Sequence, residues 1–153
     1  MTQRLFATPL AVWERDGLKA ALVKAELPAD DIDNPNAFFW RFESGADVPV
    51  GFGGIELHGA DALLHSVVTL PPVRQIGMGA AIVDVLETEA RARNCRAIYV
   101  LTASQTKFFA RLGYSPCSRD AVPEPVRASA QFAALCPPNA SAMVKRIADT
   151  GSD

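Results

Sequence analysis

The sequence predicts one α/β domain with a mixed central sheet and helices on both faces of that sheet. Residues 12–27 and 80–94 have the apolar spacing of amphipathic helices, residues 37–70 contain short β-rich runs, and a further apolar run follows at 96–101. A chain of 153 residues has the length of one compact domain. We expect a single domain over residues 1–153, with 148–153 as a frayed tail.

The first half of the chain predicts a helix followed by an antiparallel meander. Leu18, Ala21, Leu22 and Ala25 recur at three- and four-residue steps, as one face of a helix requires. A turn-rich loop follows at 28–36, and the runs AFFWRFES, VGFGGIELH and ALLHSVVTL are separated by turn signals. The third run is apolar on both alternating faces, which indicates a central strand covered on both sides.

The second half predicts a strand–helix–strand unit with a parallel strand pair. The helix at 80–94 has one apolar side and one polar side, and the polar side carries Asp84, Glu87, Thr88 and Arg91. Residues 96–101 read as a buried strand, 104–113 as a short helix ended by Gly113, and 139–147 as a final strand. The proline-rich segment 115–138 is left unassigned.

Composition argues against several classes of protein. A formal net charge of −2 with 21% charged residues gives no sign of a basic surface that would bind nucleic acid. No apolar run approaches the ~20 residues of a membrane span, and charges at residues 14–16 interrupt any signal-peptide pattern, so we expect a cytoplasmic protein. Cys95, Cys117 and Cys136 are spaced neither as a disulfide framework nor as a metal site; we expect reduced thiols and no metal.

The most informative motif is Arg74-Gln75-Ile76-Gly77-Met78-Gly79, between the two-face-buried strand and the long amphipathic helix. A helix N-terminus presents unpaired N–H groups and a partial positive charge, so a glycine-containing loop that opens onto it suits a pyrophosphate. A strand-to-helix turn that binds no ligand would have the same local sequence. The wider context favours the phosphate interpretation.

That context resembles the GNAT N-acetyltransferase superfamily over nearly the whole chain. LLHSVVTLPPVRQIGMGAAIVDVLETEA is similar to its motif A, and KFFARLGY is similar to its later cofactor-flanking helix. The resemblance implies a GNAT fold in which a splayed pair of parallel strands admits the pantetheine arm of acetyl-CoA. Carried over by position, the cofactor-binding residues are Val67, Val68, Thr69, Arg74, Gln75, Ile76, Gly77, Met78, Gly79, Ala80, Thr102 and Phe108.

Two positions depart from the family pattern. Gln75 replaces the glycine common after the arginine, which removes backbone freedom but no hydrogen-bond donor. Phe109 stands where many members have a tyrosine that protonates the departing CoA thiolate, and a phenyl ring has no proton to give. LTASQT, KFFARLGY and QFAALCP resemble most closely a branch encoded with arsenic-resistance genes.

Amine acetylation needs a group that removes a proton from the attacking nitrogen. Glu56 and His65 are the catalytic candidates, although a solvated strand-end carboxylate and a hydrogen-bonded core histidine are the alternative interpretations. His58 and Asp61 are weaker candidates because each adjoins a turn, and Tyr114 could replace the missing acid only if it points toward the sulfur. Aromatic residues at 38–42 either line an acceptor pocket or fill the core.

The resemblance therefore implies an enzyme that transfers acetyl from acetyl-CoA to the primary amine of a small molecule, such as an amino-acid-like toxin or an organoarsenical. A degenerate acyl-CoA-binding regulatory module is the alternative, and Phe109 is its best argument. Acetylation of a protein lysine stays open, because the net charge does not decide it. A homodimer follows from the family alone.

Overall fold

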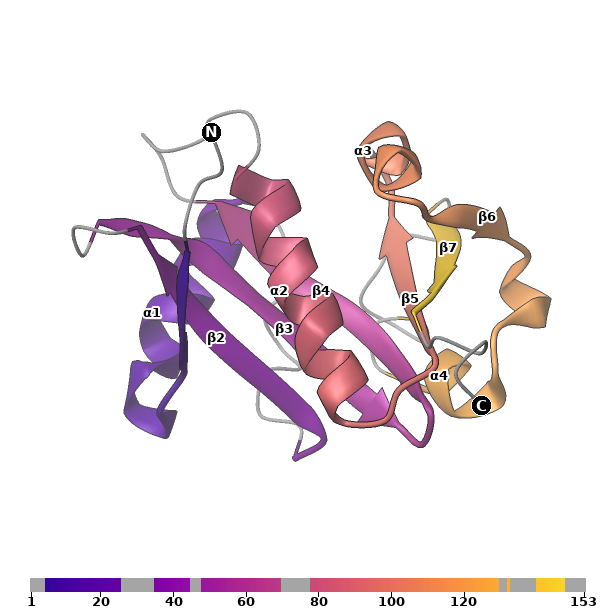
Figure 1. Ribbon diagram of the computed structural model, residues 1–153, viewed down its shortest axis with the longest axis horizontal. Coiled ribbons are helices and arrows are strands. Elements are labelled where there is room, and N and C mark those ends of the chain that lie inside the picture. Colours follow the sequence, from indigo (N-terminus) through magenta and orange to yellow (C-terminus); the bar gives the residue numbers. More distant parts are fainter. Residues whose placement is uncertain are drawn as a thin grey trace.

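The computed structural model describes residues 5–25, 35–44, 48–69, 78–129, 132 and 140–147. Its strands form a seven-stranded sheet in the order β1-β2-β3-β4-β5-β7-β6 (Figure 1). The strands are β1 Phe6–Pro9, β2 Ala37–Glu43, β3 Pro49–His58, β4 Asp61–Thr69, β5 Ala97–Thr102, β6 Ser115–Cys117 and β7 Ser141–Arg146. The helices are α1 Arg15–Lys24, α2 Met78–Ala92, α3 Thr106–Arg111 and α4 Glu124–Arg127, with 3-10 turns η1 Val12–Glu14 and η2 Arg119–Ala121.

The predicted antiparallel meander is confirmed. β2 pairs with β3 and β3 with β4, both antiparallel, and the β3–β4 hairpin turns at Gly59, whose φ of 68° lies in the left-handed region. The short edge strand β1, which no sequence pattern indicated, pairs antiparallel with β2 and ends at Pro9. Proline suits an edge strand because it has no N–H to donate to a ladder.

The predicted strand–helix–strand unit is also confirmed. β4 and β5 are parallel and are joined through α2, as the sequence pattern requires. β7 pairs antiparallel with β5 on its other edge, and β6 pairs antiparallel with β7. The observed architecture is thus the mixed sheet expected from the sequence, and the described part of the unassigned segment contains β6, η2 and α4.

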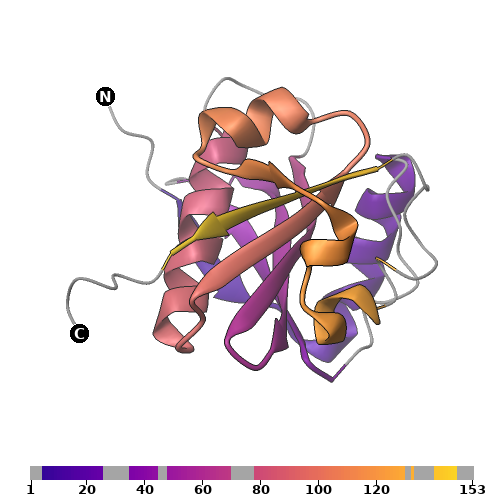
Figure 2. The same ribbon diagram turned by 90° about the vertical axis from the view of Figure 1, so that its right-hand side faces the viewer.

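Helices cover both faces of the sheet, and Figure 2 shows α2 and α1 on opposite sides of it. Under α2, the apolar cluster includes Ile55, Leu64, Ile82, Leu86 and Phe109. The other face carries two separate clusters. One lies under α1 and includes Leu18, Leu22, Phe39 and Val68; the other lies under α4 and includes Leu63, Val122 and Val126.

One residue on the polar side of α2 is buried. Glu87 is only 4% exposed. The reason is tertiary: the C-terminal end of α3 and the strand β7 supply polar partners to this side of α2, namely Tyr114 and Lys145. Within the described ranges, no helix is long and apolar enough to cross a membrane.

Candidate functional site

The parallel strands β4 and β5 separate part-way along their length. Their ladder ends where Leu64 pairs with Val100. Beyond that pair, β4 continues to Thr69 and β5 to Thr102, while β5 stays paired with β7 on its far edge. Figure 1 shows the two ribbons moving apart toward the end of the sheet that carries α3. Beyond Leu64, β4 stays paired with β3, whereas its edge toward β5 is placed to pair with an extended ligand.

The start of α2 lies against α3 near this opening. A Cβ atom at Gly79 would lie 3.2 Å from Phe108 Cζ, so glycine permits the close approach of the two helices. α2 is 15 residues long, and its first turn carries the unpaired N–H groups that favour an anion. Met78, Gly79 and Ala80 form this turn. The remaining predicted phosphate-loop residues, Arg74, Gln75, Ile76 and Gly77, lie outside the described residues.

Thr102 ends β5 and shapes the turn into α3. Its Oγ1 accepts hydrogen bonds from the backbone N–H of Gln105 at 2.8 Å and, at 3.4 Å, from that of Ser104. The hydroxyl also carries a proton of its own to donate. Thr102 therefore has a structural role at the opening, in addition to the cofactor contact predicted for it.

The two phenylalanines of α3 differ in their surroundings. Phe108 is half-buried and faces Gly79, whereas Phe109 is buried in the cluster under α2 and packs edge-on against Tyr114, with ring centroids 5.4 Å apart. Phe109 thus fills core space at the position where the family resemblance expects a proton donor. Its side chain has no group that could protonate a thiolate.

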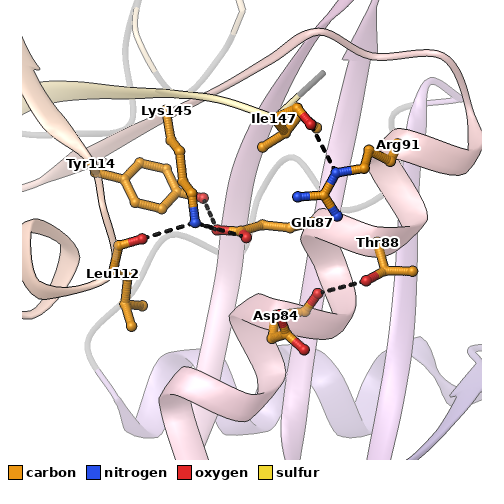
Figure 3. A network of polar contacts seen from close by, with 8 residues as sticks. All are labelled: Asp84, Glu87, Thr88, Arg91, Leu112, Tyr114, Lys145 and Ile147. Atoms are coloured by element: carbon orange, nitrogen blue, oxygen red, sulfur yellow. Dashed lines mark hydrogen bonds and ion pairs between the residues drawn. The ribbon is translucent and has the colours of Figure 1, made fainter. Parts of the chain in front are cut away.

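Tyr114 is also a poor substitute for that donor. Its hydroxyl donates a hydrogen bond to Glu87 Oε2 at 3.0 Å (Figure 3). Burial, reinforced by the charge and hydrogen bond of Glu87, raises the pKa of Tyr114 well above its ordinary value. The hydroxyl proton is therefore held by a carboxylate inside the protein, which removes Tyr114 from the candidates for general acid.

The two predicted catalytic residues lie on the sheet face that α1 and α4 cover. Glu56 is fully buried on β3, in register with Leu63 of the α4 cluster. His65 on β4 is 5% exposed and meets the ring of Phe39, part of the α1 cluster, edge-on at 5.4 Å. These buried polar side chains therefore lie where the two apolar clusters adjoin. His65 is the first residue of β4 beyond the last pair with β5.

The weaker candidates lie at the other end of β4. Glu56 Oε1 lies 2.8 Å from Nε2 of His58, which pairs in register with Asp61 at the start of the strand. Burial raises the pKa of Asp61, and the charges of Arg146 and His58 partly offset the rise. Asp61 opens β4 and still pairs with β5, whereas the strands separate only after Leu64, so Asp61 is the least favoured base by position.

The aromatic run of β2 divides between the two faces. Trp40 and Phe42 belong to the core under α2, and the Arg93 guanidinium lies over the rings of Phe38 and Trp40 at 5.2 and 5.3 Å. Only Phe39, of these four aromatic residues, packs in the cluster beside His65. The core interpretation therefore holds for most of the run, and Phe39 is the one member placed beside a candidate catalytic residue.

The described cysteines are a buried Cys95 and a half-buried Cys117, and both are free thiols. Burial raises the pKa of each thiol, which disfavours the reactive thiolate. Cys136 lies outside the described residues. Within the part of the chain that the structure describes, no three histidine, cysteine or acidic side chains are grouped to hold a metal ion.

Two features of this region had no clear sequence signal. Glu87 and Lys145 form an ion pair at 3.0 Å although they are 58 residues apart in the chain. Gly54 allows Phe39 to cross β3 and reach His65, because a Cβ atom there would lie 2.4 Å from the Phe39 ring. A glycine inside a strand pattern is the one sign that could have indicated such a close approach.

Solved structures with similar folds include several acetyltransferases. N-acetylglutamate synthase from Neisseria gonorrhoeae, complexed with coenzyme A and N-acetyl-glutamate, superimposes with a TM-score of 0.80 at 15% identity over 97% of this chain. The match covers 36% of the synthase, so this chain spans about a third of its length. A Mycobacterium tuberculosis protein in complex with CoA matches over 94% of this chain and 99% of its own, with a TM-score of 0.75 and 22% identity.

A further similar structure is that of an aminoglycoside 6'-acetyltransferase type Ii, with a TM-score of 0.68 and 21% identity over 94% of this chain and 98% of that one. No curated protein matches the chain by sequence. The sequence model of the acetyltransferase (GNAT) family matches residues 3–114, which include the strand separation, the start of α2 and α3. The chain therefore belongs to the GNAT acetyltransferase family.

Proposed function

We propose that the protein transfers the acetyl group of acetyl-CoA to the primary amine of a small molecule. The observation that carries the proposal is the separation of β4 and β5 beyond Leu64 and Val100, beside the first turn of α2. This arrangement offers backbone hydrogen-bonding groups to an extended arm and a helix N-terminus to its phosphates. Similar structures of acetyltransferases were solved with coenzyme A bound.

Different residues of the chain would bind the different parts of acetyl-CoA. Val67, Val68 and Thr69 would present β4 backbone to the pantetheine arm, and residues 74–80 would hold the pyrophosphate at the start of α2. Thr102 and Phe108 would border the arm from the side of β5 and α3. Val67 and Thr69 are half-buried, so this part of β4 is reachable from outside the core.

In the proposed reaction the amine nitrogen attacks the thioester carbonyl, a C–N bond forms, the C–S bond breaks, and CoA leaves as a thiolate. The amine must first lose a proton, and we assign this step to Glu56, with His65 as the second candidate. Their burial on one face of the sheet, between the clusters under α1 and α4, supports both assignments. Because Phe109 has no proton and Tyr114 is held by Glu87, solvent protonates the thiolate.

For the acceptor, we propose an amino-acid-like amine, with toxins and organoarsenicals of that kind as the first compounds to test. The resemblance of KFFARLGY and QFAALCP to the arsenic-resistance branch supports this choice. The similar structures include proteins named for acetylating glutamate and aminoglycosides, which are small molecules with amino groups. A cytoplasmic location and a homodimeric state complete the proposal.

The second candidate function is an acyl-CoA-binding regulatory module without turnover. Phe109 favours it, because the chain lacks the usual acid at that position and packs a phenyl ring into the core there. The two functions share the donor site and differ only in turnover. A protein that binds acetyl-CoA but releases no CoA with any amine of a broad panel would support the regulatory module.

Calorimetric titration with acetyl-CoA and CoA tests the donor site first. We expect binding in the wild type and its loss in Gly77→Trp, because an indole in the phosphate loop blocks the anion. Gly17→Trp is the matched control: it adds the same side chain in α1 at a glycine whose Cβ would meet nothing within 4 Å, and it should bind like the wild type. Absence of binding by folded wild-type protein would refute both candidate functions.

Measurement of turnover tests whether Glu56 or His65 acts as the general base. With an amine that is acetylated, Glu56→Gln should lower kcat by about a hundredfold or more while acetyl-CoA binding is unchanged, because the amide keeps the shape of the carboxylate but cannot take a proton. His65→Gln distinguishes the second candidate in the same assay. If neither substitution slows acetylation, the assignment of the base is wrong even though the donor site stands.

A further inference from the structure

A buried polar network joins α2, the end of α3 and β7. Glu87 on α2 is 4% exposed, and its carboxylate is contacted by Lys145 of β7 and by Tyr114, which follows α3 (Figure 3). A carboxylate is rarely buried unless charge and hydrogen bonds compensate for its lost hydration. The partners of Glu87 come from two further elements, so the compensation depends on how those elements are placed.

Lys145 is the centre of the network. Its Nζ donates to both carboxylate oxygens of Glu87, at 3.0 and 3.1 Å, and to the backbone carbonyl of Leu112 at 2.9 Å. Leu112 is the C-terminal cap of α3, where helix carbonyls have no partner within the helix and a positive charge is favourable. The ammonium group of Lys145 therefore neutralises the Glu87 carboxylate on α2 and caps the C-terminal end of α3.

Gly113 gives the chain the geometry that the network requires. Its φ of 99° lies in the left-handed region, and a Cβ atom there would lie 3.3 Å from Lys145 Cε. The turn sends the carbonyl of Leu112 toward Lys145 and the side chain of Tyr114 toward Glu87. The backbone N–H of Tyr114 donates to the carbonyl of Phe109 at 3.0 Å, which closes α3 with a tight turn.

The same two helices meet a second time at the proposed donor site. Gly79, in the first turn of α2, faces Phe108 of α3, and Glu87 lies eight residues further along α2, about 12 Å at 1.5 Å per residue. α3 is only 6 residues long and Phe109 is its one buried side chain, so contacts at its ends contribute to its position. Its C-terminal end is held by the network, and Phe108 lies in its middle.

We propose that Glu87, Lys145 and Tyr114 are positioning residues for acetyl-CoA: they hold α3 against α2 so that Phe108 lies at the correct distance from the start of α2. The network lies on the α2 side of the sheet, and Glu56 and His65 lie on the opposite face, so we expect it to act on the donor and not on the acceptor. The inference rests on the donor site of the proposed function and is independent of the assigned base and acceptor. Hydrogen bonds suit this task because their distance and angle requirements fix one arrangement of the two helices.

The decisive variant is Glu87→Leu/Lys145→Leu, which removes both charges together. Replacement of a buried ion pair by apolar groups often leaves a fold intact, whereas removal of one partner leaves an unpaired charge. We expect a folded protein whose Kd and KM for acetyl-CoA rise on the order of tenfold, because small displacements of ligand-lining groups carry penalties of this size or larger. The KM for the amine should stay at the wild-type value.

Val126→Ala is the matched control. Val126 is fully buried under α4 on the opposite face of the sheet, so its truncation lowers stability without touching α2 or α3. It should leave the Kd for acetyl-CoA unchanged. Tyr114→Phe removes a single hydrogen bond of the network and serves if the double variant does not fold; it should weaken acetyl-CoA binding in the same direction by a smaller factor.

The possible outcomes distinguish a failure of the positioning role from a failure of the donor site itself. If the variants melt like Val126→Ala but bind acetyl-CoA like the wild type, the network is only structural and the proposal is overturned. If binding weakens in Val126→Ala by the same factor, the effect belongs to general stability, which also overturns it. If the folded wild type does not bind acetyl-CoA, the donor site itself is refuted and the positioning role with it.

Discussion

At the scale of single residues, the aromatic pair Phe109 and Tyr114 shows how burial determines chemistry. The rings pack edge-on at 5.4 Å, and both side chains are buried. Phe109 has no proton to give, and the hydroxyl of Tyr114 is bound to Glu87. The position expected to supply an acid is thus used for packing, and under the proposed function solvent would protonate the departing thiolate.

Because the hydroxyl of Tyr114 is buried and hydrogen-bonded, we expect the folded protein to lose stability at alkaline pH. Burial and Glu87 raise its folded-state pKa above the ordinary value of 10.0. Below pH 10.0 both folded and unfolded protein keep the proton, whereas above it the unfolded chain ionises first and is favoured. Between about pH 10 and pH 11 the free energy of unfolding should therefore fall by up to about 1.4 kcal/mol per pH unit more in the wild type than in Tyr114→Phe.

Urea unfolding at a series of pH values measures this difference. Tyr99→Phe is the control, because burial also raises the pKa of Tyr99 but this residue is only half-buried, and its removal should change the slope less. Equal slopes for the wild type and Tyr114→Phe would show that the hydroxyl is not held as the structure has it.

At the scale of elements, β3 has a glycine, Gly54, at the point where the ring of Phe39 crosses the strand. Phe39 on β2 pairs with Gly54 on β3, and Gly54 pairs with His65 on β4. The ring of Phe39 passes over the glycine and meets the imidazole edge-on. One aromatic contact therefore connects three strands, and it is made to His65, the second candidate base.

Gly54→Ala should disrupt this contact. The added Cβ would lie 2.4 Å from Phe39 Cδ1 and 3.0 Å from the carbonyl oxygen of Phe38, so the ring must move. We expect a loss of about 1–3 kcal/mol in the free energy of unfolding, measured by urea titration, as for other overpacked cores. Gly17→Ala is the matched control: it lies in α1 with nothing within 4 Å, and it should stabilise the protein by about 0.5–1 kcal/mol through helix propensity. A neutral Gly54→Ala would contradict the described crossing.

At the scale of the whole molecule, the sheet separates a continuous core under α2 from two smaller clusters under α1 and α4. The donor would lie between β4 and β5, next to helices of the continuous core, and the candidate bases lie on the other face. The proposed function therefore places the donor and the candidate bases in different layers of the molecule.

Donor binding should therefore stabilise the whole fold. A ligand that binds only the folded state, at a hundred times its Kd, raises the free energy of unfolding by about 2.7 kcal/mol. For a chain of this size the melting temperature should rise by about 5–10 °C, which differential scanning fluorimetry with acetyl-CoA would detect. Gly77→Trp should show no rise. An equal rise in that variant would place the ligand elsewhere than the predicted phosphate loop.

Local pattern by itself determined much of this protein. The two-residue alternation at 37–70 and the helical spacing at 80–94 predicted the meander and the β4–α2–β5 unit, because both periodicities arise within single elements. The resemblance along nearly the whole chain, and not the glycine loop alone, indicated the family that the sequence model shows. β1 was missed because a strand of 4 residues at an edge leaves too short a pattern.

Only the tertiary structure decided the contacts between distant residues. Helical periodicity placed Glu87 on the polar side of α2, but it cannot reveal its ion pair with Lys145, 58 residues away, or the end of α3 that covers it. The point where β4 and β5 separate and the passage of Phe39 over Gly54 likewise depend on how strands with remote sequence positions pair. Sequence neighbours specify single elements, whereas burial and register, which set pKa values and the shape of the site, arise only when the elements pack.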